Sequence, residues 1–314
     1  MINGVVGFGE SVIDFIPMGM DDGCTVYKAC PGGSVANMCV VLARQGIPAA
    51  FVGGVGRDHF GQFLKERISQ YGVHTEKMIF TPGCGTNLTF VHLKEDGQRE
   101  YSSVNRPGAD KMVSYDQIDV EEILKYRVLH VSSNAMACGK TREAQPRLLE
   151  EAKKRGMLIS YDVNYRPGFY ETKEDALRVL QTPLAWADIV KVTEEELEVL
   201  TGGSGRRSAE KLLENGAGIV LVTKGNEGCD YYFRGGFGHA DSFQTEAVDT
   251  TGAGDCFLGG FLSWMLRNGS LKQPDKRQME EACVYANKTA ALSIRKTGAM
   301  SSVPTREEVE QYKF

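Results

Sequence analysis

The sequence lacks the histidine and cysteine patterns that usually hold a metal. Its five histidines include no H-x-x-x-H pair, and its eight cysteines are irregularly spaced, without a C-x-x-C pair. These absences argue against a zinc site and against a redox motif. We therefore expect the thiols at scattered buried or half-buried positions, where free cysteines are usually found.

Long apolar runs and charge clusters are also missing. No stretch approaches the roughly 20 apolar residues that a membrane span requires. The opening residues, MINGVVGFGESVIDF, lack the basic region of a signal peptide and carry Glu10 and Asp14. The net charge of -5 is spread along the chain without a Lys/Arg cluster, which argues against nucleic acid as a partner. We expect a cytoplasmic protein that binds neither membranes nor nucleic acid.

The common phosphate-binding patterns are absent as well. There is no G-x-x-x-x-G-K-[ST], and no G-x-G-x-x-G follows a strand, because Phe257 stands at the third glycine position after Gly252 and Gly254. The missing dinucleotide fingerprint excludes a nicotinamide-dependent oxidoreductase. If the protein binds a nucleotide, a different kind of segment must hold the phosphates.

Short β-branched runs alternate with amphipathic helical patterns along most of the chain. This alternation is typical of β-α units in a parallel sheet, and we expect one main domain over residues 1–314. The N-terminal part predicts a strand at 4–9, a helix from Ser34 to Arg44, a strand at 49–53 and a helix at 58–71. Further strands are predicted at 127–133, 158–164, 188–193 and 218–223.

Two stretches break this rhythm. Residues 86–104 read as two alternating strands joined by Asp96-Gly97, a strong hairpin signal. Residues 14–30 also look extended, with a turn at Asp21-Asp22-Gly23. Both are too polar on alternate positions for central parallel strands. We predict a small antiparallel lid, formed by roughly 14–30 and 86–107, over the sheet end where α/β folds bind ligands.

The segment VDTTGAGDCFLGGFL (248–262) places glycines and one acid before a buried helix. The apolar positions from Phe257 onward predict a helix that begins near Gly254 or Asp255. Its first amides, at Gly252, Ala253 and Gly254, could hold an anion such as a phosphoryl group. The competing interpretation is that the acid only caps the helix and occupies these same amides.

A lone aspartate beside an anion site is what phosphoryl transfer to a hydroxyl needs. Asp255 could accept the alcohol proton while the amides hold the transferring charge. The pair Gly259-Gly260 supports a special role for this helix, because glycine inside a helix costs about 1 kcal/mol each unless another element packs closely.

The chain resembles the ribokinase-type carbohydrate kinase family, nearest to its fructokinase branch, over essentially residues 4–304. GESVIDFIP (9–17), CPGGSVANMCVVLARQG (30–46) and VDTTGAGDCFLGGFL match the family's first strand and its two signatures. DVNYRPGFY (162–170) matches the branch pattern D-x-N-x-R, with Tyr170 where tryptophan is frequent. The resemblance implies a ribokinase-like three-layer α/β/α fold with a mainly parallel central sheet and a small antiparallel β lid.

Site roles follow from the resemblance. It makes Asp255 the catalytic base and the amides of Gly252, Ala253 and Gly254 the anion hole. The positions implied at the sugar are Asp14, Gly32, Gly33, Asn37, Asn105 and Arg166. Those implied at the nucleotide are Asn164, Thr223, Lys224, Gly225, Gly228, Asn287, Gly298 and Ala299. An ordinary surface arginine is the alternative for Arg166.

Metal positions are implied too, with departures from the family pattern. Glu196 would hold Mg²⁺ through water, but Thr193 replaces the asparagine of the family's N-x-x-E. Asp249, Thr251 and Ser302 would match a monovalent-cation (K⁺) site. Asn105 stands where the fructokinase pattern has arginine, and Arg106 follows one place later. Because neighbours in a strand face opposite sides, this shift leaves the sugar's identity open.

The resemblance implies an ATP- and Mg²⁺-dependent kinase for a primary hydroxyl of a small sugar, most simply fructose. A kinase for 2-keto-3-deoxygluconate, ribose or a nucleoside is the nearest alternative, and a non-catalytic sugar sensor on the same scaffold is the second. A homodimer would be favoured if the outer face of the lid were apolar, but strand alternation does not show which face is exposed.

Overall fold

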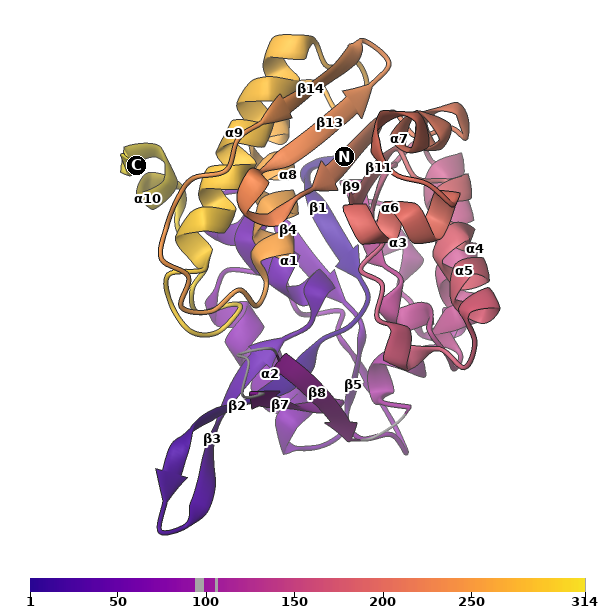
Figure 1. Cartoon of the computed structure of the whole chain (residues 1–314). Helices are drawn as coiled ribbons and strands as arrows, with labels where there is room; N and C mark the ends of the chain where they lie inside the picture. The colour runs from indigo at the N-terminus through magenta and orange to yellow at the C-terminus, as the bar shows by residue number, and fades with distance from the viewer. Residues whose placement is uncertain (94–98, 105–106, 314) are drawn as a thin grey trace.

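The computed structural model describes residues 1–93, 99–104 and 107–313 and places a mostly parallel sheet at its centre (Figure 1). The sheet has eight strands in the order β14-β13-β12-β11-β10-β9-β1-β4. The strands are β1 (Ile2–Phe8), β4 (Ala49–Val52), β9 (Tyr126–Ser132), β10 (Leu158–Asp162), β11 (Ile189–Thr193), β12 (Ile219–Thr223), β13 (Cys229–Phe233) and β14 (Gly236–Ala240). From β4 to β12 every neighbouring pair is parallel, and β13 and β14 add an antiparallel edge.

Helices cover both faces of this sheet. The helices are α1 (Ser34–Arg44), α2 (His59–Gln70), α3 (Val120–Ile123), α4 (Thr141–Lys154), α5 (Lys173–Gln181), α6 (Glu194–Thr201), α7 (Gly205–Glu214), α8 (Ala253–Asn268), α9 (Lys276–Ser293) and α10 (Arg306–Gln311). Helices α1, α8 and α9 pack on one side, and α4, α6 and α7 on the other. No helix of the described residues is long and apolar enough to span a bilayer.

The two-sided burial explains why the central strands are mostly apolar on both faces. Val5 joins the hydrophobic core on the α1 side, whereas the next residue, Val6, joins the core on the α4 side. In the same way, Ile219 belongs to the core on the α1 side and Val220 to the core on the α4 side. Side chains alternate across a strand, so a strand covered on both faces needs apolar residues at every position. The predicted three-layer α/β/α fold is confirmed.

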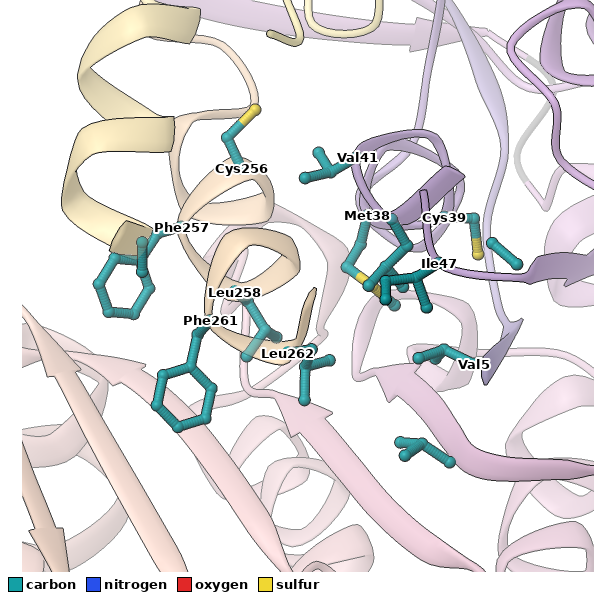
Figure 2. Close-up of a cluster of buried hydrophobic side chains, with 14 of the residues drawn as sticks. Val5, Met38, Cys39, Val41, Ile47, Cys256, Phe257, Leu258, Phe261 and Leu262 are labelled. Carbon is teal, nitrogen blue, oxygen red and sulfur yellow. The ribbon is translucent and has the colours of Figure 1, made fainter. Parts of the chain in front are cut away.

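Helix α8 is buried almost all round, not on one face only as its spacing predicts. A Cβ atom on Gly259 would lie 2.6 Å from Cγ1 of Val41 in α1, and one on Gly260 would lie 2.8 Å from Oγ1 of Thr289 in α9. Figure 2 shows apolar side chains of α1 and α8 gathered beside the two helices. The glycine pair therefore lets α8 fit between two neighbouring helices.

A second sheet stands at one end of the first and has the order β3-β2-β7-β8. Its strands are β2 (Val12–Asp21), β3 (Cys24–Gly32), β7 (Leu88–Leu93) and β8 (Arg99–Val104), and a short parallel pair, β5 (Gly54–Gly56) and β6 (Ile79–Thr81), lies apart from it. The pairs β2–β3 and β7–β8 are antiparallel, as expected, but β2 and β7 join them in parallel. The predicted turn at Asp96-Gly97 lies outside the described residues.

Candidate active site

A pocket of about 920 Å³ opens along the carboxyl ends of the parallel strands. Its lining comes from the ends of β1, β10, β11 and β12, from the first turns of α1 and α8, and from strands β2, β7 and β8 of the smaller sheet. This edge is where open α/β sheets bind ligands. The pocket therefore lies where the sequence places it.

The carboxylate of Asp255 lies in this pocket and is held by helix α1. Ser34 Oγ donates a 2.7 Å hydrogen bond to Oδ1, and Asn37 Nδ2 donates a 2.8 Å hydrogen bond to Oδ2. These contacts bring the two predicted signature segments together. Asn37 was a predicted site residue, whereas Ser34 was not.

The first turn of α8 stays open toward the pocket. Its N-cap residue Gly252 has φ 80°, and no side chain caps the helix, so Asp255 does not occupy the amides. The N–H groups of Gly252 and Gly254 form no hydrogen bond with the residues that the structure describes. The Ala253 N–H, in contrast, donates to the Thr250 carbonyl at 3.2 Å. The prediction that all three amides are available for an anion is therefore corrected, because the Ala253 amide already donates within a turn.

A buried ion pair lies directly behind this turn. Lys191 Nζ is 3.1 Å from Asp162 Oδ1, and both side chains are almost fully buried. The ammonium group would lie 3.1 Å from a Cβ atom on Gly254, so Gly254 lets the backbone approach a fixed positive charge. Sequence reasoning missed Lys191, although a lysine inside the apolar run DIVKVT is a visible signal.

The surroundings of Asp255 favour its protonated form more than water does. Burial, and then the nearby charge of Asp162, raise its pKa to about 6, while the hydrogen bonds from Asn37 and Ser34 and the charge of Lys191 act in the opposite direction. A carboxylate with a pKa just below neutrality can accept a proton and still be ionised at physiological pH. This is the electrostatic setting that a general base requires.

The predicted sugar residues are only partly assembled around the pocket. Asp14, Gly33, Asn37 and Arg166 line it, whereas Gly32 is not among its lining residues. Gly32 instead lets Asp14 pack closely, because a Cβ atom on Gly32 would lie 2.1 Å from Oδ2 of Asp14. The Arg166 side chain is exposed, and its guanidinium donates to the Tyr165 carbonyl at 3.2 Å. Asn105 and Arg106 lie outside the described residues.

Most predicted nucleotide residues lie farther along the same pocket. Asn164, Thr223, Lys224, Gly225, Gly228 and Asn287 are among its lining residues. Lys224 Nζ is 3.3 Å from Asp230 Oδ2. Asn287 Nδ2 donates to the carbonyls of Ala240 and Asp241 at 2.9 and 3.1 Å and thereby ties α9 to the end of β14.

Gly298 and Ala299 do not line the pocket. The Gly298 N–H donates to Asp249 Oδ2 at 2.9 Å, and the Thr251 N–H donates to Asp249 Oδ1 at 2.8 Å. Asp249 therefore ties the segment before α8 to the loop that contains Ser302. Asp249 and Ser302 also lie outside the lining, and Thr251 alone of the predicted cation set reaches it.

Glu196 lines the pocket with a carboxylate that the backbone holds in place. Its Oε1 accepts from the Tyr165 N–H at 2.7 Å, and its Oε2 accepts from the Thr193 N–H at 2.8 Å. Thr193 caps α6 in return, since its Oγ1 accepts from the Glu196 N–H at 3.2 Å. Threonine thus keeps the acid in place where the family has asparagine. Each oxygen retains a lone pair, which suits a hydrated Mg²⁺.

Comparison with known proteins identifies the family. The model of the pfkB family carbohydrate kinases matches residues 3–306. Fructokinase-1 of Oryza sativa subsp. japonica is 39% identical over 311 residues, which cover 97% of this chain and 96% of that protein. Fructokinase-1 of Zea mays is 38% identical over 313 residues, which cover 98% and 96%.

Two solved fructokinase structures resemble the structure of this chain. The fructokinase of Xylella fastidiosa with bound ATP has a TM-score of 0.91 at 27% identity and covers 99% of this chain and 98% of that chain. The fructokinase of Vibrio cholerae O395, in a form with fructose, ADP and calcium ion, has a TM-score of 0.88 at 28% identity and covers 98% of each chain. The chain belongs to the pfkB family of carbohydrate kinases and is a sugar kinase.

Proposed function

We propose that this kinase transfers the γ-phosphoryl group of ATP to a primary hydroxyl of fructose. The observation that carries the proposal is the Asp255 carboxylate, which faces the pocket beside the open amides of Gly252 and Gly254. The names of its relatives support fructose as the acceptor. The bound ATP of the Xylella fastidiosa structure supports ATP as the donor.

In this proposal Asp255 accepts the proton of the attacking hydroxyl. Ser34 and Asn37 orient its two oxygens, and the amides of Gly252 and Gly254 hold the charge on the transferring phosphoryl group. Lys191 adds a buried positive charge behind them. Asp14, Gly33 and Asn37 hold the sugar, with Arg166 near the phosphates.

Mg²⁺ fits the carboxylate of Glu196, which would hold it through water. When bound, the ion neutralises part of the phosphate charge. The residues Asn164, Thr223, Lys224, Gly225, Gly228 and Asn287 form the proposed nucleotide subsite, with Gly298 and Ala299 behind its lining. We also propose that Asp249, Thr251 and Ser302 form the K⁺ site, although only Thr251 reaches the pocket lining.

The four-stranded sheet of β2, β3, β7 and β8 is the proposed lid of one kinase domain. Its closure would exclude water and limit wasteful ATP hydrolysis. Four apolar side chains on its strands, Met18, Met20, Val26 and Val104, are at least 43% exposed. Three of them, Met18, Met20 and Val26, lie together at the end of the β2–β3 hairpin. These exposed apolar side chains favour a homodimer through the lid. A cytoplasmic location is part of the same proposal.

A coupled assay with ATP and Mg²⁺ tests the function. The acceptors to compare are fructose, ribose, 2-keto-3-deoxygluconate, tagatose phosphate and adenosine. We expect fructose to give the highest kcat/KM. Turnover of another acceptor with a higher kcat/KM would reject fructose, and the absence of turnover with every sugar, despite binding, would favour a sugar sensor.

A further inference from the structure

Several buried oxygens in the pocket receive no hydrogen bond from any residue that the structure describes. Oxygens of five pocket-lining side chains are buried without a partner among the described residues, namely those of Glu10, Asn37, Asn87, Asp110 and Asn134. Each of the five residues is at most 7% exposed. Buried polar atoms almost always have a partner, and leaving one unpaired costs about 1–3 kcal/mol. A ligand that brings several donors is therefore expected here.

Glu10 is the most constrained of these residues. It lies two residues after the end of β1. Its Oε2 accepts a 2.8 Å hydrogen bond from Ser132 Oγ at the end of β9. Its backbone carbonyl lies 2.6 Å from the place where a Cβ atom on Gly33 would be, so the segment is packed against the first turn of α1. One carboxylate oxygen is thus fixed by the protein, and Oε1 is left for a ligand.

Asp110 and Lys111 share the pocket with Glu10. Lys111 Nζ donates to Asp110 Oδ2 at 2.9 Å and lies 4.9 Å from the centre of the Phe169 ring. This pairing uses one oxygen of Asp110, and Oδ1 has no donor in the part of the chain that the structure describes. This lysine does not donate to Glu10 Oε1 either.

The other groups near the buried Glu10 carboxyl are charged or carry hydroxyls. Burial raises its pKa to about 7, the charge of Asp110 acts in the same direction, and Ser132 and Lys111 oppose it. The Tyr170 hydroxyl, which donates to Ser133 Oγ at 3.2 Å, is also close enough to feel its charge. None of these groups donates to Oε1.

The chemistry of these oxygens argues against the triphosphate of ATP as their partner, and their neighbours place them near the acceptor. Carboxylate and amide oxygens repel phosphate oxygens, whereas a sugar offers several hydroxyl donors. Asn37 also contacts Asp255, and the carbonyl of Asn87 accepts from the Ile13 N–H at 3.0 Å, next to Asp14 in β2. The unpaired oxygens therefore belong to the acceptor end of the pocket.

We propose that Glu10 is a further sugar-binding residue, whose Oε1 forms a hydrogen bond with a hydroxyl of the acceptor, while Asp110 and Asn134 bind neighbouring hydroxyls. Neither the motifs nor their spacing point to these three residues. The inference rests on the proposed function, because it takes the acceptor to be a polyhydroxylated sugar.

The test compares Glu10→Met, which removes the oxygens, with Glu10→Gln, which preserves the shape. Thermal melting and ATP titration check that each variant is folded. In Glu10→Met we expect the KM for the sugar to rise about tenfold or more, as for a lost charge-assisted hydrogen bond, with the KM for ATP within twofold. Glu10→Gln should lie between this variant and the wild type.

Gln145→Met is the matched control. Gln145 is also buried with an unpaired oxygen and donates to the Ser132 carbonyl at 3.1 Å, but it does not line the pocket. We expect its sugar KM within twofold of the wild type. An equal rise in KM in the control and in Glu10→Met would show a structural role and overturn the inference.

Deoxy analogues of the sugar identify the contact. Removing the hydroxyl that Glu10 binds should lower the kcat/KM of the wild type about tenfold. The same removal should lower the kcat/KM of Glu10→Met less than threefold. Equal losses in both enzymes for every analogue, or an unchanged sugar KM in folded Glu10→Met, would reject the role of Glu10. The wild-type acceptor assay keeps this result separate from the proposed function, which fails if no sugar is phosphorylated or if another acceptor gives a higher kcat/KM than fructose.

Discussion

Asn37 Nδ2 donates a 2.8 Å hydrogen bond to Asp255 Oδ2 across 218 residues of sequence. The bond joins the first turn of α1 to the first turn of α8, so the proposed sugar-binding segment and the proposed base cannot move independently. A substitution on either side should therefore change chemistry and sugar binding together, unless it preserves the shape of the side chain.

Asp255→Asn is the shape-preserving test of the base. We expect kcat to fall by roughly 10²–10⁴-fold, which is the usual contribution of general base catalysis, while titrations still show binding of sugar and ATP. Steady-state kinetics and calorimetry measure the two effects. Near-normal turnover in this variant would refute the role of Asp255.

The pH dependence should follow the ionisation of Asp255. Its pKa of about 6 means that the base is ionised and active above pH 6, and that kcat/KM falls as the pH is lowered through 6. Ser34→Ala removes a hydrogen bond that lowers this pKa, so the acidic limb should move to higher pH. A limb that stays in place, or moves to lower pH, contradicts this account.

Local patterns predicted the individual elements better than the contacts between them. The helix predicted from Ser34 to Arg44 has those same bounds, and α8 begins at Ala253, one residue before the predicted start at Gly254. The 3.6-residue period and the glycine positions are local signals, so a single sequence carries them. The burial of α8 on all sides is not local, because it depends on α1 and α9.

The missed site residues have a common reason. Lys191 and Asp162 pair because β10 and β11 are neighbours in the sheet, and the periodicity of a strand does not specify its partner. Likewise, the parallel pairing of β2 and β7 is a choice that two separate hairpin signals leave open. Residue type identifies candidates for a site, whereas strand order decides which candidates meet.

The Lys191–Asp162 pair gives a prediction for stability. Lys191→Met leaves a buried carboxylate without its counter-ion, which should lower the free energy of unfolding by about 3–5 kcal/mol. The double variant Lys191→Met/Asp162→Asn removes both charges and should recover part of that loss. Denaturant unfolding of the two variants decides the point: equal stability of Lys191→Met and the wild type would show that the pair is not coupled.

Gly259→Ala tests the close packing of α8 against α1. The added Cβ atom would lie 2.6 Å from Val41 Cγ1, and overpacking of this kind usually costs about 1–3 kcal/mol. The melting temperature should therefore fall, although alanine is the better helix former. Gly168→Ala is the control, because nothing lies within 4 Å of its Cβ position. An unchanged melting temperature in Gly259→Ala would show that the two helices can separate without cost.

The exposed lid residues test the proposed homodimer. Met18 and Met20 are 57% and 69% exposed in β2, and an interface through the lid would bury them. Light scattering should give a dimer for the wild type and a monomer for Met18→Gln/Met20→Gln. Phe237→Gln is the matched control, because Phe237 is 47% exposed but belongs to β14, away from the lid, and it should leave the dimer intact. A monomeric wild type at micromolar concentration, or a dimer that persists in the double variant, would exclude these methionines from an interface.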